Sequence, residues 1–354
     1  IGSESGLTQS ASGVKTLFAA ALLSSTSLIV MGSSSAQATP ASSCSPTPAG
    51  GVTSTCSGTI TNSEQFTVDN VTIVTDGTFN QDTSGNDAAA QEDNVGIKVT
   101  GDNATITHNG TIRTGDTPSE MDPVIVNHPG IYVRSTGGAA TITSASGAST
   151  FTEVANSDAL RINNTGGAAT ITNQGTADTT GDFSYGLSAV ASTTATAGNK
   201  AGGVVIARGY HSYGVFATGS SATAYNEGTG ASVTTTGEDG HAVFARANEG
   251  GTAIALNGTG GTITTSGAFA GGVYARSDTN ATATNDGTII QSGTATAGVV
   301  SGSAFLSGGG TAKAYNTGSI TINGALGRGV IARSDTVILS NSGTVNVTGD
   351  RGAC

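Results

Sequence analysis

Side chains able to perform acid–base or nucleophilic chemistry are few and scattered along this chain. The four histidines are His108, His128, His211 and His241. The densest polar cluster is Glu238-Asp239-Gly240-His241, and acidic residues beside glycine are typical of a turn. Glycoside-cleaving enzymes need two carboxylates that converge on one face, and the sequence does not repeat acids in that way. We therefore expect no catalytic residues and no enzyme activity.

The cysteines do not form a metal-binding pattern. No CxxC or CxxH accompanies Cys44, Cys56 and Cys354, and no GGxGxD run predicts calcium. We expect no metal and no cofactor. Cys44 and Cys56 flank the segment SPTPAGGVTST, so a local disulfide is expected in an oxidising compartment. Two free thiols are the alternative.

The composition indicates short strands joined by tight turns. Glycine accounts for 54 of 354 residues, tryptophan is absent and aromatic residues make up 5%. Charged residues are 10%, well below the roughly 25% of average soluble domains. The net charge of −11 argues against binding to nucleic acid or to anionic lipid.

The first part of the chain has the layout of a secretory signal peptide. In residues 15–38, Lys15 precedes an apolar run, which ends in Ala36-Gln37-Ala38. We expect a signal peptide within residues 1–38, cleaved after Ala38, and an exported protein. A buried helix is the alternative for this run. Residues 39–60 are rich in proline, serine and glycine, which predicts a linker or a cap.

Residues 61–354 contain a repeat of about 28 residues. Clear copies read GVYARSD-TNATATNDG-TIIQSG at 272–293 and GVIARSD-TVILSNSG-TVNVTG at 329–349. The distance between the first two units, from Ile97 to Ile131, is longer because the segment TPSEMDPVIVNHP is inserted there. This insertion predicts a loop on one face of the solenoid. The first inward apolar residue of each unit serves as its anchor: Ile97, Ile131, Leu160, Leu187, Val215, Val243, Val273, Val299 and Val330.

Each unit holds three strand-like runs separated by glycine, without helical periodicity. Three strands per unit predict a three-sided coil, and stacked coils pair each strand in parallel with its copy. The fold class expected is therefore an all-β, three-sided parallel β-helix, or solenoid. Neighbouring coils would lie about 4.8 Å apart.

Side-chain alternation in the second run predicts a column of buried asparagines. Lys313 must face solvent, so Ala312, Ala314 and Asn316 point inward. Glycine follows two residues after each asparagine in this position. Stacked amides can hydrogen-bond along such a column. The predicted structural column comprises Asn173, Asn226, Asn285, Asn316 and Asn341.

Outward threonines on the second run form a second pattern. TxT pairs occur at Thr105/Thr107, Thr141/Thr143, Thr170/Thr172 and Thr282/Thr284. Regular TxT arrays resemble ice-binding surfaces, but Tyr225, Lys313 and Tyr315 interrupt this one. An ordinary β-branched strand surface is the favoured interpretation.

The first run carries the strongest candidate for a binding surface. If Val273 and Ala275 face inward, Tyr274 and Arg276 face outward. Equivalent positions predict an exposed aromatic stripe beside a row of arginines, and such residues are favoured in binding hot spots. The alternatives are that arginine stems only cover the rings, or that the rings face inward. The candidate ligand-binding residues are Tyr132, Arg134, Phe216, Phe244, Arg246, Tyr274, Arg276 and Arg333.

The signal-like segment 15–38 and repeats such as GVYARSD…ATATNDGTIIQSG resemble the passenger region of autotransporter adhesins of Gram-negative bacteria. The resemblance covers about residues 61–354 and implies a right-handed β-helix displayed at the cell surface. It also implies a C-terminal outer-membrane β-barrel as a partner. The chain ends inside a repeat at Cys354, so we expect a fragment truncated before that barrel.

The function expected is adhesion or cell–cell contact without catalysis, through surface molecules of host cells or sister cells. One alternative is a β-helical enzyme that degrades polysaccharides. Another is a structural stalk that presents a different domain.

Overall fold

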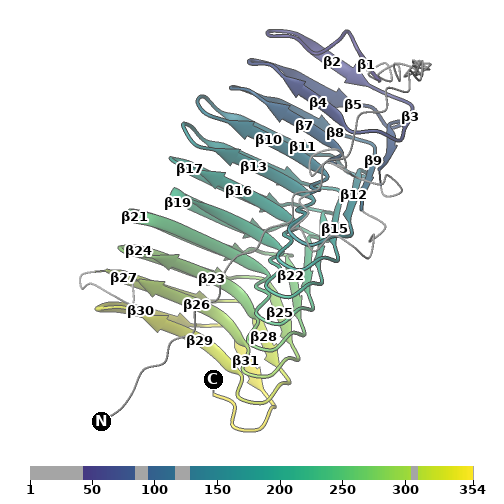
Figure 1. Ribbon diagram of the computed structural model, residues 1–354. Coiled ribbons are helices and arrows are strands. Elements are labelled where there is room, and N and C mark those ends of the chain that lie inside the picture. The colour runs from purple at the N-terminus through teal and green to yellow at the C-terminus, as the bar shows by residue number, and fades with distance from the viewer. Residues whose placement is uncertain (1–42, 84–94, 116–127, 304–309, 354) are drawn as a thin grey trace, which may run out of the picture. The chain divides into compact units, whose positions relative to one another are not determined.

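The computed structural model describes residues 43–83, 95–115, 128–303 and 310–353. The expected signal peptide lies outside these residues, and so does the intruding segment at 117–129 except for His128 and Pro129. The described residues form a parallel β-solenoid with roughly 28 residues per turn and no helix. Successive coils stack from the purple to the yellow end of the chain (Figure 1). The predicted all-β parallel solenoid is therefore confirmed.

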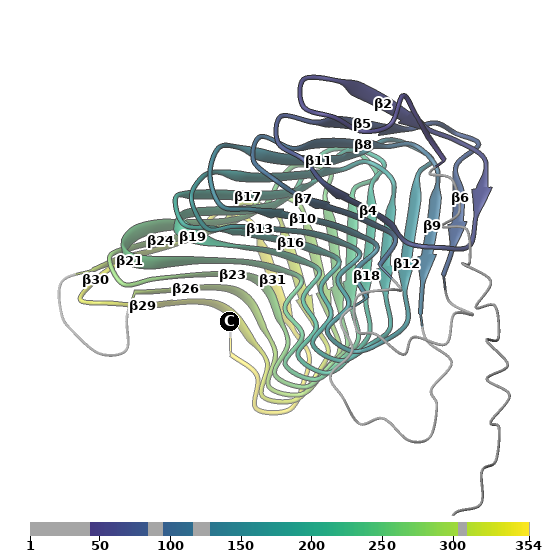
Figure 2. The same cartoon turned by 45° about the horizontal axis from the view of Figure 1, so that its top comes forward.

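Three ladders of parallel strands run along the stack, one for each strand of a coil (Figure 2). Two long strands, β19 and β21, belong to the first ladder at their start and to the second at their end. The first ladder contains β4 (Glu64–Thr67), β7 (Ile97–Thr100), β10 (Ile131–Ser135), β13 (Leu160–Asn164), β16 (Leu187–Ala191), β19 (Val215–Asn226), β21 (Val243–Asn257), β23 (Gly271–Ser277), β26 (Ala297–Ser303) and β29 (Arg328–Arg333).

The second ladder begins near the amino-terminal end of the described chain and includes the later halves of β19 and β21. Its other strands are β2 (Thr53–Cys56), β5 (Thr72–Thr75), β8 (Thr105–His108), β11 (Ala140–Ser144), β14 (Ala169–Asn173), β17 (Thr194–Asn199), β24 (Asn280–Asn285), β27 (Thr311–Asn316) and β30 (Thr336–Asn341).

The third ladder has eleven strands. They are β3 (Thr59–Ile60), β6 (Asn80–Asp82), β9 (Thr111–Thr114), β12 (Ser149–Thr152), β15 (Thr176–Thr179), β18 (Val204–Ala207), β20 (Ser232–Thr235), β22 (Thr262–Thr265), β25 (Thr288–Gln291), β28 (Ser319–Ile322) and β31 (Thr344–Val347).

All nine predicted anchors occupy one column of the first ladder, each directly paired with the next. Eight of them, from Ile97 to Val299, are fully buried, and Val330 of the last coil is partly buried. The pairing also places Glu64 in this column, one coil before Ile97. Strict alternation of inward and outward side chains produces this alignment, because a slip of one residue would expose the whole column.

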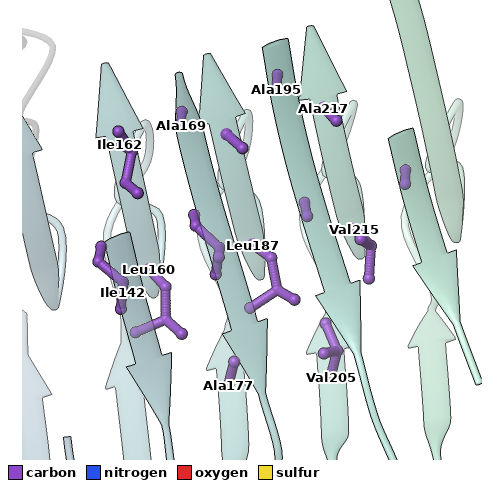
Figure 3. Packing of buried hydrophobic residues seen from close by; sticks show 14 of the residues in the cluster. Ile142, Leu160, Ile162, Ala169, Ala177, Leu187, Ala195, Val205, Val215 and Ala217 are labelled. Carbon is purple, nitrogen blue, oxygen red and sulfur yellow. The ribbon is translucent and has the colours of Figure 1, made fainter. Parts of the chain in front are cut away.

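The core consists of stacked aliphatic side chains from the three ladders. Figure 3 shows Leu160, Leu187 and Val215 of the first ladder beside Ile142 and Ala169 of the second. Small residues dominate the inward positions of the middle coils, where Ala217, Ala224, Ala245 and Ala255 are fully buried. The interior is narrow there, so it leaves little room for large side chains.

Residues 43–60 are part of the first coil. β1 (Cys44–Ser45) pairs antiparallel with β2, and a disulfide joins Cys44 to Cys56. β2 and β3 in turn pair in parallel with β5 and β6 of the following coil. Antiparallel β1 covers part of the edge that β2 would otherwise expose, and unpaired edges invite association with other chains.

A column of residues in the left-handed conformation marks the turn between the third and first strands. It comprises Asn156, Phe183, His211, Asp239, Phe269, Ala295, Leu326 and Arg351, with φ between 51° and 58°. Except in the last coil, the backbone N–H of each of these residues donates to a carbonyl oxygen of the next coil. The N–H of Phe183, for example, donates to the carbonyl oxygen of Tyr210 at 2.8 Å. Stacking of the coils imposes this conformation, because it directs the N–H along the axis.

Candidate functional site

The predicted binding stripe lies on the outward face of the first ladder. Direct pairing aligns Phe216, Phe244 and Tyr274 in consecutive coils. A second column stands two residues before each anchor and contributes Tyr185, Tyr213 and His241. Together these six side chains form a ring ladder, defined here as Tyr185, Tyr213, Phe216, His241, Phe244 and Tyr274.

Small residues at the start of each strand bring the two columns together. Gly214 lies between Tyr213 and the anchor Val215, and a Cβ there would overlap Val233 of the third ladder and the carbonyl oxygen of Ala242. The backbone can therefore turn tightly over the core at this point. Tyr213 then reaches Phe216, with the ring centroids 5.6 Å apart.

Most neighbouring rings within a column stack on one another, whereas Phe216 and Phe244 are tilted at 47° with their centroids 5.4 Å apart. Tyr185 and Tyr213 lie 4.9 Å apart with an interplanar angle of 4°, and Tyr213 and His241 lie 5.3 Å apart at 9°. Phe244 and Tyr274 stack at 4.8 Å and 13°. These distances match the rise of about 4.8 Å between parallel strands, so each coil supplies one ring at the natural stacking distance.

Edge contacts connect the two columns. Tyr213 meets Phe244 at 5.2 Å and 84°, and His241 meets Tyr274 at 4.9 Å and 78°. Such T-shaped pairs contribute about 0.5–1.5 kcal/mol beyond the area they bury. The ring faces are therefore occupied mainly by other rings, and the ladder presents mostly edges and hydroxyls to solvent.

The prediction of an exposed stripe is wrong for two of its residues. Phe216 is 9% exposed and Phe244 is 6% exposed, whereas Tyr132 and Tyr274 are partly exposed. The cause is the column of Tyr185, Tyr213 and His241, whose rings contact both phenylalanines. These residues sit at the corner before the strand, outside the alternation on which the prediction was based.

A buried carboxylate closes the amino-terminal end of the ring ladder. Asp158 takes the position below Tyr185, and its Oδ1 accepts the backbone N–H of Tyr185 at 2.8 Å. Its Oδ2 lies 3.8 Å from Nε of Arg161, whose guanidinium lies over the ring of Tyr132 at 5.3 Å. Burial raises the pKa of Asp158 to about 6, and nearby Arg161 partly opposes this shift. Tyr132 is therefore linked to the ring ladder indirectly, because Arg161 contacts both the Tyr132 ring and Asp158.

At the carboxyl-terminal end of the column formed by Tyr185, Tyr213 and His241, the last ring is the neutral imidazole of His241. The backbone N–H of Gly271 donates to Nδ1 of His241 at 3.0 Å, so Nδ1 must be unprotonated. Burial lowers the pKa of His241 to about 4, and repulsion from His211 adds to this effect. Gly271 replaces a ring in the next coil, where a Cβ would approach His241 Nδ1 to 2.8 Å.

The predicted arginines lie beside the ring ladder, two residues further along each strand. Arg246 pairs directly with Arg276, while Arg134 and Arg333 stand in the same column several coils away. All four are exposed. Within the described part of the chain, no carboxylate forms an ion pair with Arg246 or Arg276. Asp278 is therefore not a partner of Arg276, and the side chain of Glu249 lies outside the described set.

The asparagine column is continuous and longer than predicted. The structure places Asn173, Asn226, Asn285, Asn316 and Asn341 in it, together with Asn199 and Asn257. Each Nδ2 donates to Oδ1 of the next asparagine at 2.7–2.9 Å. Toward the amino terminus, register continues the column through Ser144 and His108 to Thr75, whose Oγ1 lies 3.0 Å from His108 Nδ1. We call the seven amides the asparagine ladder.

The outward threonines of the second ladder do not form an uninterrupted array. The outward threonines Thr105, Thr141 and Thr170 pair directly, and further along Tyr225 and Lys313 occupy outward positions of the same ladder. No group of three or more potential metal ligands occurs among the residues that the structure describes. Nor does any helix in this part of the chain have the length and apolarity to cross a membrane.

Comparison with known families identifies one match. Residues 230–353 are similar to the BigA third pectate lyase-like domain. The matched segment includes the carboxyl-terminal part of the ring ladder with Arg246 and Arg276, but not Tyr185 or Tyr213. No curated protein and no solved structure matches the chain.

Proposed function

We propose that this chain is a non-catalytic part of a bacterial surface protein and acts in adhesion or cell–cell contact. The observation that carries the proposal is the exposed pair Arg246 and Arg276, which lies without an acidic partner among the described residues, beside the ring ladder. Like charges in adjacent strands repel each other. Two adjacent exposed cations on a chain of net charge −11 favour a role in binding an acidic partner.

Arginine and aromatic side chains supply much of the energy at protein interfaces. The ring ladder holds Tyr274 rigidly beside Arg276, so little conformational entropy is lost when a partner binds. The proposed partner is a surface molecule of a host cell or of a sister cell that presents acidic groups to the arginines.

Surface display is supported by two independent features. Residues 15–38 have the pattern of a signal peptide, and BigA-like domains belong to bacterial surface proteins. We propose an autotransporter passenger as the specific class, with a β-barrel anchor as its outer-membrane partner.

The proposal is tested by displaying the chain on a bacterium that does not adhere. We expect adherence to epithelial cells, or clumping of the displaying bacteria, and a clear loss of both in Arg246→Ala/Arg276→Ala. A charge-matched control is Arg208→Ala/Lys313→Ala, which removes one positive charge just after β18, where Arg208 pairs with Asp178, and one on β27. An equal loss of adherence in both double variants would mean that only the net charge matters, and it would contradict a specific contact surface.

An enzyme that cleaves polysaccharides is the second candidate, favoured by the words "pectate lyase-like" in the matched family. Two carboxylates lie near the ring ladder. One is Asp158, which is buried against Arg161. The other is Asp239: burial raises the pKa of Tyr213, and the charge of Asp239 raises it further. Hydrolysis by paired carboxylates needs both groups to converge on the substrate, and each of these two lies against a basic side chain, Asp158 against Arg161 and Asp239 against His211. Release of reducing or unsaturated sugars from polygalacturonate, abolished by Asp158→Asn, would favour the enzyme.

A further inference from the structure

The loop that joins the second strand of a coil to the third differs in length along the stack. After Asn173, Asn285, Asn316 and Asn341 the chain returns to the third ladder within three residues. After Asn199, Asn226 and Asn257 the loops are longer. The three long loops are joined by backbone hydrogen bonds, from Gly202 N–H to Thr229 O and from Gly228 N–H to Thr259 O, both 3.1 Å. They form one raised ridge.

A hollow of about 520 Å³ runs beside this ridge. Its polar wall comes from the residue that follows the ladder asparagine in successive coils. Gly258 widens the hollow, because a Cβ there would lie 2.9 Å from Cβ of Glu227. We name it the corner groove, and the residues that define it are Gln174, Lys200, Glu227, Leu256, Gly258 and Asp286.

The corner groove is elongated along the solenoid axis. Gln174 and Asp286 stand four coils apart, which corresponds to about 19 Å at the usual spacing of parallel strands. The volume lies within the range of about 300–1,000 Å³ that is typical of small-ligand sites. Its shape therefore suits a short linear ligand that lies parallel to the axis.

Apolar contact comes from Leu256, which lines the groove, and from Tyr225, which borders it. Leu256 pairs directly with Tyr225 of the preceding coil. The ring of Tyr225 leans back over Gly198, where a Cβ would overlap it. Because Gly198 has no Cβ, the ring of Tyr225 can lie close to the sheet. Nζ of Lys200 lies 5.9 Å from the ring centroid, which places the base of the groove next to this aromatic surface.

We propose that the corner groove binds a short neutral oligosaccharide. The wall carries one cation, two carboxylates and one amide, so it matches neither a polyanion nor a polycation. Carboxylate and amide oxygens accept hydrogen bonds from sugar hydroxyls, and Tyr225 and Leu256 offer apolar contact to the C–H faces of the sugar rings. A peptide strand would need an unpaired sheet edge, but β14, β17, β19, β21 and β24 are paired on both sides here.

An array of immobilised neutral and acidic oligosaccharides tests this proposal with the whole purified chain. We expect binding to neutral glycans, weakened about tenfold or more by Tyr225→Ala and by Glu227→Gln. Gly198→Ala should have the same effect while the aromatic ring is retained, because the new methyl group displaces it. Far-UV circular dichroism and the thermal midpoint establish that each variant is folded.

Tyr315→Ala is the matched control, since Tyr315 occupies the same outward column over Thr284 and away from the groove. We expect its affinity to equal that of the wild type. Arg246→Ala/Arg276→Ala should also bind normally, which separates this site from the proposed contact surface. Binding to acidic glycans alone, or loss of binding in either control, would overturn the proposal. So would unchanged binding in folded Tyr225→Ala and Glu227→Gln.

Discussion

Asn226 donates a hydrogen bond from Nδ2 to Oδ1 of Asn257 in the next coil, at 2.9 Å. The same amide accepts a bond from Asn199, and both contacts are completely buried. The relationship recurs along seven coils, so every amide in the interior of the asparagine ladder is both donor and acceptor. Removal of one amide therefore takes the donor away from Oδ1 of the next asparagine, while Nδ2 of the preceding one keeps its bonds to backbone carbonyls.

Asn226→Ala should therefore destabilise the solenoid strongly. It removes three hydrogen bonds of the Asn226 side chain and leaves the buried Oδ1 of Asn257 without its donor. Each buried group left unsatisfied costs about 1–3 kcal/mol, so we expect a loss of about 3 kcal/mol, measured by denaturant unfolding. Asn280→Ala is the control, because Asn280 is exposed. Equal stability of the two variants would show that the ladder is not needed.

The Cys44–Cys56 disulfide should stabilise the first coil only. It closes a short loop, for which the entropic stabilisation is about 3 kcal/mol, and contacts in a solenoid extend only to the neighbouring coil. In Cys44→Ser/Cys56→Ser we expect faster amide exchange in β2 and β5, with no change in β20 or β22. Uniformly faster exchange along the whole chain would contradict this local role.

His241 should make the protein sensitive to acid. Its pKa in the folded state, about 4, is below its ordinary value of 6.5. The stability it contributes is therefore complete above pH 6.5 and is lost as the pH falls through about 4. His241→Phe keeps the stack and removes the proton site, so the fall in thermal midpoint between pH 7 and pH 4.5 should be smaller than in the wild type.

The expected difference at pH 4.5 is about 2 kcal/mol, since each pKa unit corresponds to about 1.4 kcal/mol. His108, with its pKa also lowered to about 4 by burial, should account for further acid sensitivity. Asp158 has the opposite effect on the pH dependence of stability. Its pKa is raised from 3.8 to about 6 in the folded state, so the stability that it contributes is complete below pH 3.8 and is lost as the pH rises through 6. His211→Phe is the control, because Phe183 and Phe269 already occupy that turn position. An equal shift in both variants would contradict the role of His241.

Phe269 should be replaceable with a gain in stability. Its φ is 57° and its side chain is 55% exposed, so the left-handed conformation costs energy that burial does not offset. The cost is about 1–2 kcal/mol, and glycine avoids it. Phe269→Gly should raise the thermal midpoint. Phe183→Gly should gain less, because it also loses the contacts of Phe183 with Tyr210 and His211.

The fold could be predicted from the sequence because its determinants are local. Glycine marks many of the corners, and two-residue alternation decides which side chains are buried. The anchors from Ile97 to Val330 follow directly from these two signals. The predicted column lacked Asn199 and Asn257 because Ala201 and Thr259, and not glycine, stand two residues after them. Register, rather than that spacing, places them in the ladder.

The binding surface was less predictable because exposure depends on side chains from neighbouring coils. Phe216 and Phe244 point outward, as the alternation requires, yet Tyr185, Tyr213 and His241 cover them. Recurrence of an aromatic residue two positions before the anchors is the signal that could have revealed this. The ridge of the corner groove depends in the same way on hydrogen bonds between loops of different coils.

The most direct test of the proposed contact function is the equilibrium binding of purified, labelled protein to intact epithelial cells and to displaying bacteria. We expect wild-type protein and Arg208→Ala/Lys313→Ala to bind one of these surfaces with the same affinity. We expect the affinity of Arg246→Ala/Arg276→Ala to fall about tenfold or more. Unchanged affinity of the folded Arg246→Ala/Arg276→Ala variant, or no binding of wild-type protein to either surface, would rule out the proposed contact surface.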